Sequence, residues 1–107
     1  MKIFKLSDML NGWFIGPFQP NVINTDACEV AVKNYKKGYF DKKHYHKIAA
    51  EVTVIVTGKV KMNGVIYTEG AIISLEQGEA TDFEALSDSV TVVFKIPGSR
   101  KNDKFSI

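Results

Sequence analysis

The stretch that decides the fold runs from Gly38 to Gly58 and reads GYFDKKHYHKIAAEVTVIVTG. It holds both histidines of the chain, His44 and His46, two residues apart in a strand-like segment. Because alternate side chains of a strand project to the same face, both imidazoles can point at one spot. Glu51 follows five residues later, at the start of an apolar strand, and adds a carboxylate. This donor set suits one divalent transition metal (iron, manganese, zinc, nickel or copper) and leaves positions open for water or substrate.

Short strand-like runs separated by turn signals continue on both sides of this stretch. The Asn63-Gly64 pair is the strongest hairpin signal, and one helical turn, capped by Ser7, is expected over Leu6–Leu10. Val52–Val56 is apolar or β-branched throughout, which predicts a strand buried on both faces. The expected strands are Trp13–Ile15, Ala27–Tyr35, Lys43–His46, Ala50–Thr57, Lys59–Met62, Val65–Thr68, Ala71–Leu75, Ala80–Leu86 and Val90–Ile96. This series of short strands predicts an all-β sandwich or barrel.

The spacing of the stretch resembles the first motif of the cupin superfamily at every defined position. It reads Gly38, five residues, His44, one residue, His46, four residues, Glu51, six residues and Gly58. In cupins the two histidines and the glutamate are metal ligands inside a small barrel. The resemblance therefore assigns that role to His44, His46 and Glu51, with one divalent transition metal as the cofactor.

The same resemblance implies how the whole chain is organised. It predicts a single-domain cupin-type jelly-roll barrel over residues 1–107, with 1–20 as an N-terminal arm and 99–107 as a polar C-terminal tail on the surface. Because cupins commonly pair through their sheets, it also implies a homodimer. We expect such a dimer to cover an apolar outer sheet face.

The second cupin motif is only partly present. Gly70 can begin it and Gly78 can fill its turn, but Glu76 replaces the expected proline. Thr81 stands where a histidine would supply the fourth ligand. Asp82 is a better ligand than threonine, but strand alternation sends it to the opposite face unless a bulge intervenes. The site then has three protein ligands, or it has decayed.

Three classes of function remain open, because one fold hosts many chemistries. The first is a metal-dependent enzyme acting on a carbohydrate or another small polar molecule. The second is a non-catalytic module that binds or senses a small ligand beside a degenerate metal site. Tyr35 and Thr81 are the candidate pocket residues beyond the metal ligands, and no catalytic residue is assigned. A structural subunit of a larger assembly is a third possibility.

The net charge and its distribution along the chain bear on which partners the protein can bind. The chain has 107 residues and a net charge of only +2, which gives no reason to expect nucleic acid. Eight lysines lie between Lys33 and Lys61, whereas Met62–Phe94 holds six acids and no Lys or Arg. These segments form either a basic rim that attracts an anionic ligand or oppositely charged strands that face each other.

The single cysteine and the N-terminal sequence bear on localisation. Cys28 cannot form an internal disulfide, and Met1–Leu10 lacks the long apolar core of a signal peptide. No run approaches the roughly 20 apolar residues of a membrane span. We therefore expect a cytoplasmic protein that does not associate with membranes.

Overall fold

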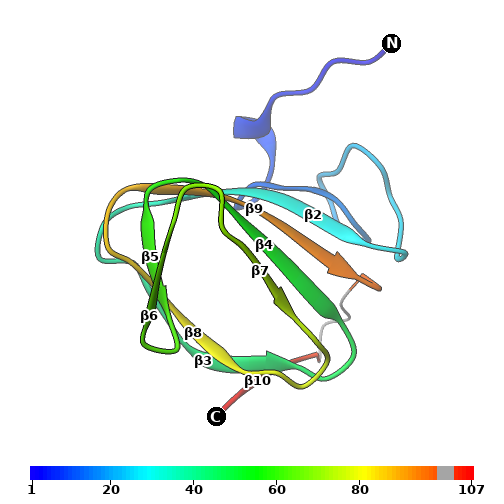
Figure 1. Ribbon diagram of the computed structural model, residues 1–107. Helices are drawn as coiled ribbons and strands as arrows, with labels where there is room; N and C mark the ends of the chain where they lie inside the picture. Colours follow the sequence, from blue (N-terminus) through cyan, green and yellow to red (C-terminus); the bar gives the residue numbers. More distant parts are fainter. Residues whose placement is uncertain (99–102) are drawn as a thin grey trace.

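The computed structural model describes residues 1–98 and 103–107, and two antiparallel five-stranded sheets face each other in it (Figure 1). The first sheet has the order β1 (Trp13–Ile15), β2 (Glu29–Tyr35), β9 (Ser89–Ile96), β4 (Ala50–Thr57) and β7 (Ile72–Leu75). The second has the order β10 (Lys104–Ser106), β3 (Phe40–His46), β8 (Thr81–Ala85), β5 (Lys59–Met62) and β6 (Val65–Thr68). A 3-10 turn, η1 (Leu6–Asp8), precedes the sheets. The all-β prediction is confirmed.

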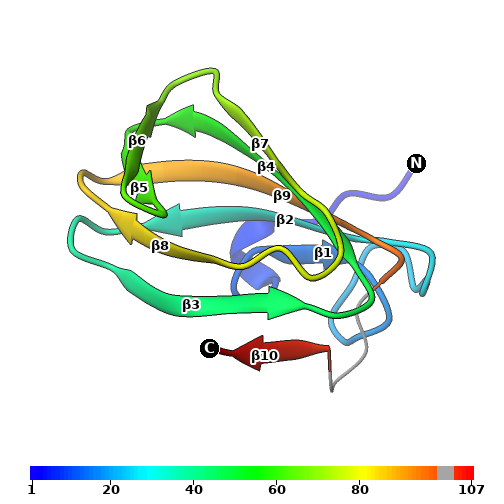
Figure 2. The same ribbon diagram turned by 60° about the horizontal axis from the view of Figure 1, so that its bottom comes forward.

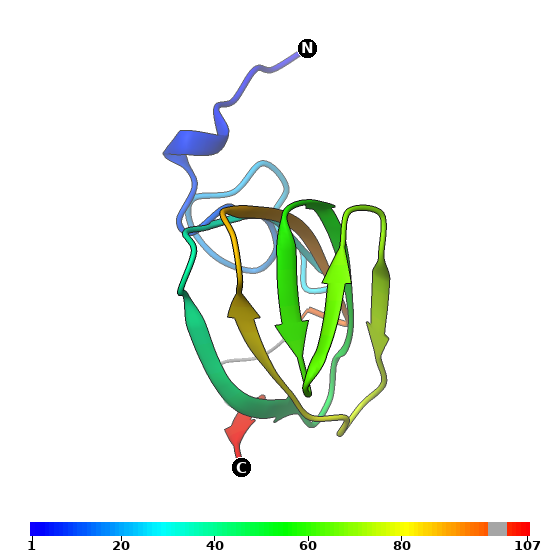
Figure 3. The ribbon, with the colours of Figure 1, turned by 60° about the vertical axis from the view of Figure 1, so that its left-hand side comes forward.

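The apolar core lies between the two sheets, toward the β5–β6 hairpin (Figure 3). It is formed by Ile55 of β4 together with Val60, Met62, Phe83 and Ala85 of the second sheet. Ile55 and Val60 are completely buried. This core stabilises one end of the barrel, so the other end can carry polar side chains.

The predicted hairpin is confirmed in detail. Strands β4, β5 and β6 have the predicted bounds. Asn63 and Gly64 have φ angles of 49° and 79°, and positive φ at both central residues is what a type I′ turn requires. The expectation that Val52–Val56 is buried on both faces is wrong in part. Thr53 and Ile55 are buried inside, whereas Val56 on the outer face is 40% exposed.

Both ends of the chain differ from the predictions. The turn η1 begins after Lys5 and has no side-chain cap, so Ser7 does not cap it. Lys104–Ser106 is exposed, as the predicted surface tail requires, but it pairs with β3 as β10 (Figure 2), and Asp103 of that tail is completely buried. Residues 99–102 of that predicted tail lie outside the described residues.

The described residues place part of the basic segment against acidic partners. Lys61 of β5 lies opposite Glu84 of β8, and the Lys36 ammonium is 4.0 Å from the Asp88 carboxylate. Lys33 instead turns to the inner face and is half-buried, and burial lowers the pKa of its ammonium, as do the charges of other lysines nearby. Within the part of the chain that the structure describes, no helix is long and apolar enough to cross a membrane.

Candidate metal centre

A small cavity of about 70 Å³ lies between the sheets, next to the apolar core, with which it shares Met62 and Phe83. Strands β2, β3, β4, β5, β7, β8 and β9 contribute to its wall. The wall includes all five residues singled out from the sequence, and it adds others. The predicted residues are Tyr35, His44, His46, Glu51 and Thr81. Polar additions are Asp41, Thr53, Glu79 and Thr91, and apolar additions are Ala49, Met62, Leu75, Phe83 and Val93.

The two histidines reach the cavity from the C-terminal part of β3. His44 and His46 project inward, as strand alternation predicts, and their rings are perpendicular with centroids 5.6 Å apart. Tyr45 between them lies on the outer face and stacks on Phe105 of β10, with ring centroids 5.4 Å apart. β10 pairs with β3 at the edge of the second sheet. This pairing and the Tyr45–Phe105 contact stabilise the strand that carries the histidines.

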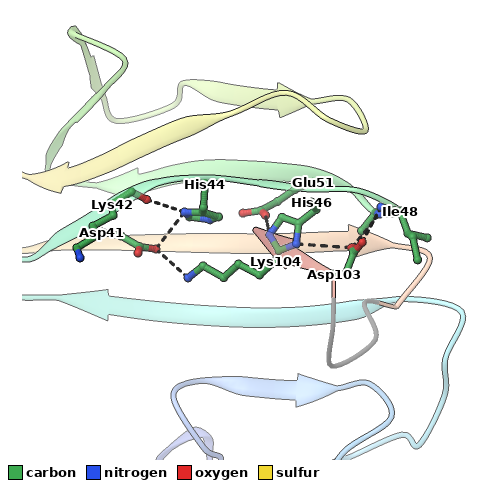
Figure 4. A network of polar contacts seen from close by, with 9 residues as sticks. Asp41, Lys42, His44, His46, Ile48, Glu51, Asp103 and Lys104 are labelled. Carbon is green, nitrogen blue, oxygen red and sulfur yellow. Dashed lines mark hydrogen bonds and ion pairs between the residues drawn. The ribbon is translucent and has the colours of Figure 1, made fainter. Parts of the chain in front are cut away.

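A close contact between two side chains of the cavity joins His46 and Glu51. The His46 Nε2 atom lies 3.2 Å from Glu51 Oε2 (Figure 4). The two side chains are largely buried, with 8% and 17% of their surfaces exposed. Burial alone would raise the pKa of the Glu51 carboxyl, but the His46 hydrogen bond and the charge of Lys95 outweigh it and lower that pKa. Glu51 is therefore an ionised acceptor at neutral pH.

This contact shows whether a metal ion suits the site. An imidazole lone pair and a carboxylate lone pair repel each other at 3.2 Å, so the position between them needs a proton or a cation. With metal–ligand bonds of about 2.0–2.2 Å, two neighbouring ligands of one metal are about 3.0–3.5 Å apart. The His46–Glu51 separation lies in this range, so these two residues fit a shared metal.

His44 has a suitable tautomer but does not complete a triad. A carbonyl can only accept, so His44 Nδ1–H donates to Lys42 O at 2.8 Å, and Nε2 is left as the free lone pair. The Nδ1 atom is also 3.8 Å from Asp41 Oδ2. Among residues 1–98 and 103–107, no group of three or more His, Cys, Asp or Glu side chains is already arranged to hold a metal. The structure thus unites His46 with Glu51 and places His44 beside them.

The orientation of β8 shows which residues of the degenerate second motif face the cavity. Thr81, Phe83 and Ala85 are buried, so they face inward, while Asp82 points outward and accepts the backbone N–H of Asn63 at 2.7 Å. No bulge turns Asp82 into the cavity. Thr81 lies opposite His44 in the β3–β8 register, and its hydroxyl donates to a backbone carbonyl at 2.7 Å.

Tyr35 closes the cavity at the side of β2. Its ring packs on Phe83 and Tyr39, with centroid distances of 4.6 Å and 4.8 Å. Burial raises the pKa of its phenol well above the usual range, and the nearby Tyr39 adds to the effect. Tyr35 therefore keeps its proton at neutral pH and can only act as a neutral hydrogen-bonding group.

Two acidic residues near the histidines were not predicted from the sequence. Asp41 faces inward because the β3–β8 register shifts between Asp41 and His44, and this irregularity breaks the alternation that would send it outward. Asp103 lies 3.6 Å from His46 Nδ1 through its Oδ2 atom. Nothing in the sequence near Asp103 connects it with the motif, since long-range pairing of β10 brings it there.

Comparison with known proteins shows which solved structures have a similar architecture. No protein-family model and no curated protein matches the sequence. Among solved structures, the chain is similar to KdgF from Halomonas sp., with 18% identity, a TM-score of 0.63 and coverage of 73% of this chain and 74% of that one. It is also similar to an uncharacterized protein with a double-stranded β-helix domain from Klebsiella pneumoniae, with 17% identity, a TM-score of 0.67 and coverage of 92% and 86%.

Oxalate decarboxylase from Bacillus subtilis is a third similar structure, with 18% identity and a TM-score of 0.65. The match covers 78% of this chain but only 24% of the decarboxylase, so the chain corresponds to about a quarter of that protein. These neighbours share the arrangement of two facing sheets, and their low identities establish the fold alone. The chain therefore has the double-stranded β-helix fold, also called the cupin fold.

Proposed function

We propose that this protein is a metal-binding cupin whose cavity holds one divalent transition metal. His46 and Glu51 would be its first two ligands, with His44 as the third. The observation that carries the proposal is the 3.2 Å contact between His46 Nε2 and Glu51 Oε2, because this separation fits two ligands of one metal and a proton or a cation must lie between the two atoms. The Mn(II) centres of the structurally similar oxalate decarboxylase from Bacillus subtilis are consistent with it.

The size of the cavity limits what can react there. A metal in this position would polarise a carbonyl or activate a water molecule. About 70 Å³ holds roughly two water molecules at ~30 Å³ each, so only the reacting group of a ligand can enter. A larger ligand must therefore extend outside the barrel.

A groove of about 750 Å³ offers that space between the N-terminal segment and β2. Tyr35 lines both the groove and the inner cavity. Aromatic, amide and ammonium groups meet in the groove, contributed by Tyr39, Asn34 and Lys33 among others. Such a lining suits a carbohydrate or another small polar molecule, which is the substrate class we propose.

A non-catalytic binding module is the second candidate. The inward position of Thr81 favours it, because a threonine stands where the fourth cupin ligand would be and its hydroxyl is already engaged by the backbone. In that case the same cavity and groove would bind a small ligand without turnover.

Metal titration of the purified protein tests the proposal. Calorimetric titration of the chelator-treated protein with Mn²⁺, Zn²⁺ and Ni²⁺ should give one bound ion per chain for at least one of them. Elemental analysis of protein purified without added metal should agree. Failure of all three ions to bind at stoichiometry would contradict the metal role and leave the ligand-binding module.

The outer face of the first sheet predicts the oligomeric state. Val52 and Val54 on β4 are half-buried, and Ile72 on the neighbouring β7 is 68% exposed. Because an apolar sheet face of this kind is stabilised by a partner, we propose a symmetric homodimer through it. Sedimentation at micromolar concentration should show a dimer, and Ile72→Lys should shift it to monomer.

Ile66 on β6 provides the control for this experiment. It is 55% exposed, like Ile72, but belongs to the other sheet. Ile66→Lys should leave the dimer unchanged. A wild-type protein that sediments only as a monomer would contradict the dimer.

A further inference from the structure

Asp103 is a buried carboxylate in contact with the β3–β4 connection. Its side chain is completely buried. Asp103 Oδ1 accepts the backbone N–H of Ile48 at 2.6 Å, and Oδ2 accepts that of Ala49 at 3.1 Å. The Asp103 backbone carbonyl also accepts the N–H of Lys47 at 3.2 Å. These three contacts fix the carboxylate beside the segment that links His46 to Glu51.

The same carboxylate faces the second nitrogen of His46. The Asp103 Oδ2 atom is 3.6 Å from His46 Nδ1, on the side of the ring opposite Glu51 (Figure 4). The Nδ1 atom is buried and makes no hydrogen bond within the described residues. A small movement of the imidazole toward Asp103 would bring the two atoms within hydrogen-bond distance, whose usual range is about 2.7–3.2 Å.

We propose that Asp103 is a positioning residue that receives the Nδ1–H of His46 when Nε2 binds a metal. This inference rests on the proposed metal-binding function. A carboxylate on the far nitrogen fixes the ring orientation and the tautomer and increases the basicity of the ligand nitrogen. His44 has the matching arrangement, because its Nδ1–H donates to the Lys42 carbonyl. Both histidines are thus held with Nε2 directed at the cavity.

The geometry of Asp103 determines how an amide would behave in its place. Ile48 and Ala49 donate to different oxygens, whereas the side chain of Asp103→Asn has only one oxygen. If that oxygen keeps the shorter contact with Ile48, the amide NH₂ faces His46 Nδ1 and donates to it. The imidazole proton would then belong on Nε2, where it blocks a metal.

Zinc-loaded protein allows this arrangement to be observed directly. The Nδ1–H of His46 should give a slowly exchanging proton resonance in the wild type, detected through the ring ¹⁵N. Asp103→Asn should lose that protected resonance and bind Zn²⁺ about 10–100-fold more weakly, measured by competition with a chelator. Asp88→Asn is the matched control, since Asp88 is an exposed carboxylate that also accepts a backbone N–H. Asp88→Asn should change neither the protected His46 resonance nor the Zn²⁺ affinity.

The outcomes separate this inference from the proposed function. Unchanged affinity in Asp103→Asn, or weaker binding with the protected resonance retained, would overturn the positioning role. If the variant does not fold, a rapidly exchanging His46 Nδ1–H in the zinc-loaded wild type would also overturn the positioning role. Wild-type protein that binds no Zn²⁺ would overturn the proposed function and this inference with it, whereas normal wild-type binding with an unaffected variant overturns the inference alone.

Discussion

Replacing His46 with alanine is expected to abolish stoichiometric metal binding while the barrel remains folded. The variant removes the nitrogen that lies 3.2 Å from Glu51, so the buried carboxylate loses its partner and a metal loses one of its two best-placed ligands. The affinity should fall by more than the roughly 100-fold that the loss of an outer partner can cost. Titration calorimetry with the ion that binds the wild type measures the change.

Lys43 on the same strand provides the control for His46→Ala. Its side chain is exposed on β3, so Lys43→Ala should bind metal as the wild type does. Circular dichroism of His46→Ala should retain the β spectrum, because His46 is not part of the apolar core around Ile55. Wild-type affinity in His46→Ala would show that the metal binds elsewhere.

Thr81→His should have the opposite effect and tighten metal binding. Thr81 lines the cavity and lies opposite His44 in the strand register, so an imidazole there would point into the same space. The cavity of about 70 Å³ gives the added ring some room. A fourth ligand should increase the affinity by about tenfold or more, or ~1.4 kcal/mol. Calorimetric titration of variant and wild type at the same pH measures it.

Thr81→Val distinguishes an added ligand from a change of shape. It keeps the branched shape and removes the hydroxyl, which donates to the backbone and not to the cavity. We expect Thr81→Val to bind metal like the wild type. Equal or weaker binding by a folded Thr81→His would contradict the position assigned to the metal, since the new ring would then fail to reach it.

The sequence predicted the parts of the site that depend on local geometry. The spacing of His44 and His46 determines that both lie on one face of the strand, because alternation along a strand needs no knowledge of the rest of the chain. The prediction of the Asn63-Gly64 turn also depended on local sequence alone, and both residues adopt the positive φ that the pair favours. Glu51 could be placed because it lies at the start of β4, which follows the histidine strand after a short connection.

The parts that the sequence did not predict depend on pairing between distant segments. Asp41 enters the cavity because of a register shift between β3 and β8, and no local pattern marks such a shift. Asp103 was expected in a polar tail, because charged residues are rarely buried without partners. Its burial depends on backbone N–H groups in the β3–β4 connection that only the folded chain presents to it.

The position of the last strand has a practical consequence for handling the protein. Ile107 donates its backbone N–H to Lys43, one residue before His44, and the two termini lie at opposite ends of the molecule (Figure 1). A polyhistidine tag fused after Ile107 would therefore begin beside the native imidazoles and compete with them for the same ions. A tag fused before Met1 avoids this artefact and leaves the residues around β10 unchanged.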